Sequence, residues 1–152
     1  MKYSPSMPIS ETKRSFRILL VLVLIVMTIQ GWFGDTVNIF VAPPNGITPP
    51  VFSMAAFFQM VQNYGFLLIY HAYEGIVLFV LGLITAVLAF KWSPKRSVRI
   101  CSIIGLFFLA SAAVGGYLFV LSGFANGGNS AQMGGSFIGA YALYFVALYY
   151  AK

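Results

Sequence analysis

Four long apolar stretches occupy most of this 152-residue chain, at residues 17–33, 65–90, 100–121 and 132–151. Each approaches or exceeds the roughly 20 residues that an α-helix needs to cross a bilayer. A spanning segment must hydrogen-bond its own backbone because the hydrocarbon core holds no water, so these stretches are expected to be helices. We therefore predict an all-α, polytopic membrane protein, with a single four-transmembrane-helix bundle over residues 17–152.

The small number of charged residues excludes an ordinary soluble domain. Only 8% of the residues are charged and 60% are hydrophobic, whereas soluble domains carry about 25% charged residues. We expect no separate soluble domain, and residues 1–16 are expected to form a short cytoplasmic tail. The stretch 17–33 has the charged start of a signal peptide, but no small-x-small cleavage site follows it. We interpret it as a retained first helix.

The basic residues indicate how the chain is oriented in the membrane. They occur before the first stretch, between the second and third, and at the C-terminus: Lys2, Lys13, Arg14, Arg17, Lys91, Lys95, Arg96, Arg99 and Lys152. With four spans these places lie on one side, which the positive-inside rule assigns to the cytoplasm. We predict a multi-pass plasma membrane protein with an N-in, C-in topology. The net charge of +6 then reflects topology and anionic lipid headgroups, and no nucleic-acid partner is expected.

A long outer connection joins the first two spans. The turn-forming sequence at residues 43–46, Pro-Pro-Asn-Gly, breaks regular structure in its middle. Residues 51–62 are apolar but too short to cross the membrane. We favour an interfacial helix here, followed by a bend at residues 63–65. The alternative is an outward extension of the second spanning helix.

Small residues in the last two spans predict close helix packing. Gly105, Ala112 and Gly116 recur in the third span, and Gly135 and Gly139 form a small-xxx-small pattern in the fourth. Small side chains let helices approach closely where no hydrophobic effect drives their association. Partners are therefore expected to be other membrane subunits or a second copy of the chain. The single cysteine excludes an intrachain disulfide.

His71 and Glu74 are the most informative residues for function. They are the only histidine and the only acidic residue inside apolar sequence. On a helix they share one stripe with Gly75, Gly82 and Thr85, so they are expected to face protein and not lipid. An ionisable side chain in a span costs free energy and indicates function.

Three interpretations of this stripe remain open. Heme b could bind with His71 as the iron ligand, Met133 as the sixth ligand, and Gly75 and Gly116 making room for the porphyrin. The sixth ligand could instead be His71 of a second subunit, or the iron could stay five-coordinate. Alternatively, His71 and Glu74 hydrogen-bond each other or nearby Tyr and Asn side chains, without a cofactor. A third interpretation is proton or cation handling by Glu74, as in small four-helix exporters.

Three short segments carry a resemblance to a known family. QGWFGDTVNIF ends the first span, YHAYEG opens the second, and AVGGYLFV ends the third. From residue 17 onwards the chain resembles one four-helix half of heme A synthase, the cytochrome oxidase assembly enzyme, and small archaeal membrane proteins of the same plan. The resemblance implies that His71 corresponds to a heme-ligating histidine. The partner histidine of the fourth helix is absent, and Gln132 or Met133 stands nearest to its place.

No dinucleotide fingerprint, phosphate loop, paired acidic site or serine nucleophile elbow is present, so we assign no catalytic residue. The expected function is a small subunit or accessory protein of a membrane redox complex, with heme b as its candidate cofactor. The alternatives are a structural or assembly subunit without a cofactor, and a small proton-coupled transporter, which we favour least.

Overall fold

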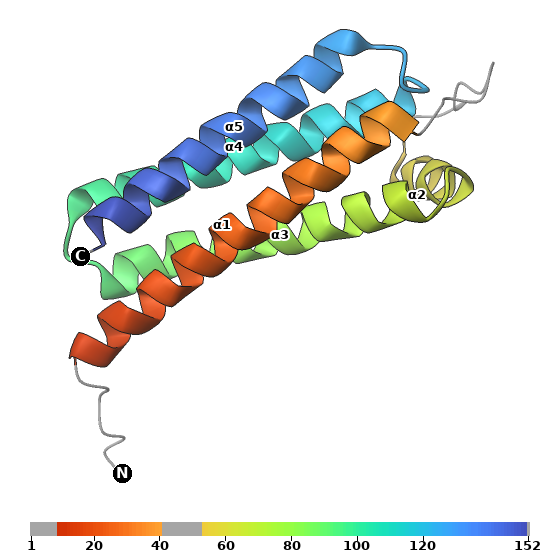
Figure 1. Ribbon diagram of the computed structural model, residues 1–152. Coiled ribbons are helices and arrows are strands. Elements are labelled where there is room, and N and C mark those ends of the chain that lie inside the picture. The colour runs from red at the N-terminus through yellow and green to blue at the C-terminus, as the bar shows by residue number, and fades with distance from the viewer. Residues whose placement is uncertain (1–8, 41–52, 152) are drawn as a thin grey trace.

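The chain folds into helices throughout the part that the computed structural model describes, residues 9–40 and 53–151. These helices are α1 (Ile9–Phe40), α2 (Met54–Asn63), α3 (Phe66–Trp92), α4 (Arg96–Leu121) and α5 (Gly127–Tyr150) (Figure 1). Four of them, α1, α3, α4 and α5, are long and apolar enough to cross a membrane. The predicted all-α class is confirmed, and the four long helices indicate a multi-pass membrane protein.

Two of the long helices start earlier than predicted. Helix α1 begins at Ile9, before the span predicted to start at residue 17, so residues 9–16 of the expected tail are helical. The basic residues there are good helix formers, which lets the helix continue beyond its apolar part. Helix α5 begins at Gly127, before the predicted start of the fourth span at residue 132, and the side chain of Asn126 caps it by accepting hydrogen bonds from the backbone N–H groups of Gly128 and Asn129.

A short helix and a bend precede α3, as predicted. Ser53 caps α2 by accepting a 3.1 Å hydrogen bond from the backbone N–H of Ala56. Gly65 then adopts a φ of 91°, a conformation that glycine reaches without steric cost. Helix α2 packs across α3 and α4 through the buried side chains of Met60 and Val61. The alternative of a continuous extension of the second span is therefore wrong. The location of α2 at a membrane surface stays a prediction.

The four long helices form a ring in which α1 and α3, α3 and α4, α4 and α5, and α5 and α1 are neighbours. The start of α1, the α3–α4 turn and the C-terminus lie at the same end of this bundle (Figure 1). At its centre Tyr144 of α5 is completely buried. A Cβ on Gly105 of α4 would lie 3.1 Å from its ring, and one on Gly82 of α3 would lie 2.9 Å from its hydroxyl. Glycine therefore makes room for the ring on two helices.

Helices α4 and α5 approach each other at Gly115. A Cβ there would lie 2.8 Å from the backbone nitrogen of Met133 and 3.0 Å from the carbonyl oxygen of Asn129. The two glycines of the small-xxx-small pattern on α5 differ in their surroundings. Gly139 packs against the ring of Phe108, whereas a Cβ on Gly135 would have no neighbour within 4 Å. The close packing predicted for small residues therefore occurs at specific positions along this pair.

The contact at Gly115 can be tested by adding one methyl group. We expect Gly115→Ala to lower the free energy of unfolding by about 1–3 kcal/mol, because the methyl group would force the two backbones apart. Gly134→Ala is a matched control, since Gly134 has open space around it and alanine favours helix by about 1 kcal/mol. Thermal unfolding of both variants in a mild detergent measures the difference. Equal melting temperatures would contradict the close approach.

Candidate functional site

His71 lies in the second turn of α3 and faces α1. Its imidazole packs against Gly34, where a Cβ would lie 3.1 Å from the ring atom Cε1, 3.7 Å from Nδ1 and 3.8 Å from Nε2. Glycine at this position of α1 therefore leaves the space that the ring fills. The expectation that His71 faces protein is consistent with this contact.

Gln30 of α1 is the second polar side chain at this contact. It is buried, with 7% of its surface exposed, and its Nε2 donates a 3.0 Å hydrogen bond to the backbone carbonyl of His71. A Cβ on Gly75 would lie 3.3 Å from the same nitrogen. The hydrogen bond and the two glycines, Gly34 and Gly75, bring α1 and α3 together. We call the group of Gln30, Gly34, His71 and Gly75, together with Glu74 one turn along α3 from His71, the α1–α3 seam.

Three polar atoms of the seam are buried without a hydrogen-bond partner in the described part of the chain. They are Oε1 of Gln30, Nδ1 of His71 and Oε2 of Glu74. A hydrogen bond between His71 and Glu74, which the cofactor-free interpretation allows, is not among the described contacts. Buried polar atoms are usually paired. The oxygens of Gln30 and Glu74 can accept a hydrogen bond from a bound molecule or contact a cation, and Nδ1 of His71 can donate or accept a hydrogen bond according to its tautomer.

The rest of Glu74's stripe lies as the helical spacing predicts. Leu78, Gly82 and Thr85 are buried, whereas Ile76, Val80, Leu83 and Val87 on the other faces of α3 are exposed. Phe79 is partly buried and packs against the core. The hydroxyl of Thr85 donates to the carbonyl of Leu81 in the preceding turn, which satisfies it within its own helix. The polar part of the stripe is therefore limited to the seam.

Met133 and Gly116, the other predicted heme-site residues, lie at a different contact. The sulfur of Met133 would be 3.1 Å from a Cβ on Gly116, which places its side chain against α4. Helices α3 and α5 are diagonal in the ring, and no described contact joins Met133 to His71. The structure therefore brings together His71, Glu74 and Gly75 on one side, and Met133 and Gly116 on the other.

The donor set of the seam is small for a metal site. Among residues 9–40 and 53–151, no group of three or more His, Cys, Asp and Glu side chains could hold a metal ion. Sequence reasoning did not assign Gln30 to the site. The sequence contained an indication of its role, because a glutamine within an apolar span costs free energy unless it hydrogen-bonds to a neighbouring helix.

No family model matches this chain, and the comparisons with curated proteins and with solved structures gave no match either. The functional argument therefore comes from the helix arrangement and the α1–α3 seam. The resemblance to one half of heme A synthase stays a prediction.

A double-mutant cycle tests the packing of His71 on Gly34. We expect Gly34→Ala to destabilise the bundle by about 1 kcal/mol, because its methyl group meets the imidazole and the ring must shift. In a His71→Ala background the same change should be neutral or slightly stabilising, since alanine is the better helix former. Unfolding of the four proteins in detergent gives the coupling energy. Strictly additive effects would contradict the contact.

Proposed function

We propose that this chain is a small multi-pass accessory subunit of a membrane redox complex, held in the plasma membrane with both ends in the cytoplasm. The observation that carries the proposal is the α1–α3 seam, where an imidazole is packed between two helices with Nδ1 unpartnered. Polar groups within a span cost free energy, and those that persist usually contact a cofactor, an ion or another subunit. The seam has too few groups for a catalytic centre, which favours a binding role.

The charge pattern supports the proposed orientation. Lys13, Arg14 and Arg17 lie near the start of α1, and further basic residues lie around the α3–α4 turn, at the same end of the bundle (Figure 1). Near the opposite end, the described residues include Asp35 and Asn126 but no Lys or Arg. Lys and Arg are enriched on the cytoplasmic side of membrane proteins, so this basic end is the proposed cytoplasmic end.

Heme b is a second candidate feature, favoured by the unpartnered imidazole of His71. The geometry does not fit His71 and Met133 as a pair of axial ligands, since each side chain packs against a different neighbouring helix. Helix α1 lies against the Cε1 side of the His71 imidazole at Gly34, and the accessory role that we propose does not require heme.

The orientation can be measured with single cysteines. In a Cys101→Ser background, we expect a membrane-impermeant maleimide to label Gly127→Cys in intact cells. Lys95→Cys should be labelled only after the membrane has been opened, because it lies in the proposed cytoplasmic turn. Both positions are exposed on the protein, so labelling depends on the side of the membrane on which each cysteine lies and not on burial. Labelling of Lys95→Cys in intact cells would contradict the N-in, C-in topology.

The subunit role can be tested by purifying the tagged chain from its native membranes in mild detergent. We expect integral membrane redox proteins to co-purify, and His71→Ala to weaken this association while the bundle still unfolds cooperatively. Phe107→Ala is a control, because this α4 side chain is 71% exposed and lies outside the seam.

The visible spectrum of the same preparation tests the heme candidate. A Soret band that is lost in His71→Ala would support heme binding, and a preparation without a Soret band would remove it. A monodisperse monomer without co-purifying membrane proteins would contradict the subunit role.

A further inference from the structure

A groove runs along the outside of the bundle between the first half of α1 and the end of α5. It is lined on one side by residues of α1 from Lys13 to Leu22, and on the other by Leu148 and Ala151. Its volume is about 530 Å³, which lies within the roughly 300–1,000 Å³ of small-molecule sites. The α1–α3 seam lies towards the other end of the bundle, so the groove is a separate feature.

The groove is basic at one end and apolar along the rest. Lys13, Arg14 and Arg17 border its beginning, and Ile18, Val21, Leu22 and Leu148 follow. The α1 residues from Arg14 onwards recur at the three- and four-residue spacings that place side chains on one helix face. None of the lining residues is acidic. An occupant that matches the groove therefore has a negatively charged end and an apolar body.

The groove is short enough to lie within one leaflet of a bilayer. From Lys13 to Leu22 the helix rises about 14 Å at 1.5 Å per residue, and its apolar part from Ile18 to Leu22 covers about 6 Å of this, less than half of the roughly 30 Å hydrocarbon thickness. Beyond that level α1 and α5 close on each other: a Cβ on Gly31 would lie 3.3 Å from the ring of Phe137, and the hydroxyls of Thr28 and Tyr141 are 3.3 Å apart. The groove is thus limited to the basic half of the bundle.

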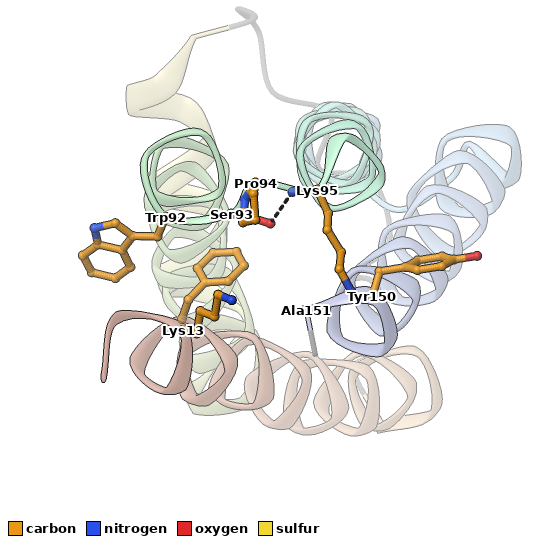
Figure 2. A pocket seen from close by; sticks show the side chains of 8 residues that line it. Lys13, Trp92, Ser93, Pro94, Lys95, Tyr150 and Ala151 are labelled. Carbon is orange, nitrogen blue, oxygen red and sulfur yellow. Dashed lines mark hydrogen bonds between the residues drawn. The ribbon is translucent and has the colours of Figure 1, made fainter. Parts of the chain in front are cut away.

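A smaller hollow adjoins the groove and shares Lys13 and Ala151 with it. Figure 2 shows Lys13 of α1 and Lys95 of the α3–α4 turn on opposite sides of this hollow, with Tyr150 of α5 and the following Ala151 beside them. Lys13 is the cation that borders both spaces.

We propose that the groove binds one anionic phospholipid of the cytoplasmic leaflet. Arg14 and Arg17, together with Lys13, hold its phosphate, because guanidinium groups bind phosphate through paired hydrogen bonds. An acyl chain lies along Ile18, Val21 and Leu22 against Leu148. The inference requires the membrane insertion proposed above, but it does not depend on the redox-subunit role.

Native mass spectrometry of the full-length chain in detergent tests this site. The probes are phosphatidylglycerol, phosphatidylcholine with the same acyl chains, and glycerol 3-phosphate as a soluble headgroup. We expect phosphatidylglycerol to bind about tenfold more tightly than phosphatidylcholine, in line with the attraction of basic residues to anionic lipid. Glycerol 3-phosphate should not compete, because it lacks the acyl chain.

Two double variants with the same loss of charge distinguish the groove from general attraction. Arg14→Gln with Arg17→Gln should weaken phosphatidylglycerol binding about tenfold, since both side chains border the groove. Lys91→Gln with Arg96→Gln removes two exposed cations near the same end of the bundle that do not line the groove, and it should change binding less than twofold. An equal loss in both variants would overturn the proposal.

A third variant, Val21→Trp, fills the apolar part and keeps every charge. It should also weaken phosphatidylglycerol binding, and unchanged binding would overturn the acyl-chain assignment. Competition by glycerol 3-phosphate would identify a site for free phosphate and overturn the lipid proposal. Thermal unfolding of each variant checks that the bundle is intact. Because the purified chain is used, the result is independent of whether redox subunits co-purify.

Discussion

The packing of Tyr144 against glycine is the interaction on which the bundle depends. Lipid is as apolar as leucine, so burial of apolar surface does not drive spanning helices together, and van der Waals contact must do so. The Tyr144 ring of α5 fills the centre because Gly82 and Gly105 leave room on α3 and α4. The buried apolar side chains of α1, Leu20, Val23 and Met27 among them, belong to the same cluster. One aromatic side chain thereby joins helices that are distant in sequence.

Glycines also make room for larger side chains at the α1–α3 seam, where these side chains are polar. Gly34 and Gly75 let the helices approach until the imidazole of His71 and the amide of Gln30 fit between them. One hydrogen bond, from Gln30 to the His71 carbonyl, crosses the seam, while three other polar atoms stay unpartnered among the described residues. A buried polar atom without a hydrogen-bond partner costs stability, so these three atoms do not support the fold as the Gln30 hydrogen bond does.

Much of the fold was predictable, whereas the site was predictable only in part. The length of the apolar stretches identified four helices, and the glycine-containing sequence at residues 63–65 indicated the bend before α3. Helices α1 and α5 start before the predicted spans, because a helix can continue into polar sequence when side chains cap it or favour it. Tyr144 is close to Tyr149 and Tyr150 at the end of its helix, yet it is buried. Hydropathy cannot distinguish a core tyrosine from an interfacial one, since both are aromatic near a span end.

The sequence by itself determined the helical class, the approximate spans and the inward stripe that contains His71 and Glu74. Those features follow from length, hydropathy and helical periodicity, which are local properties of the chain. Only the tertiary structure decided that His71 meets Gly34 and Gln30 on α1, that Met133 meets Gly116 on α4, and that a groove opens between α1 and α5. Such pairings depend on which helices are neighbours in the ring and how far they are rotated. Both follow from the fit of many side chains at once, because close packing leaves few arrangements without overlap.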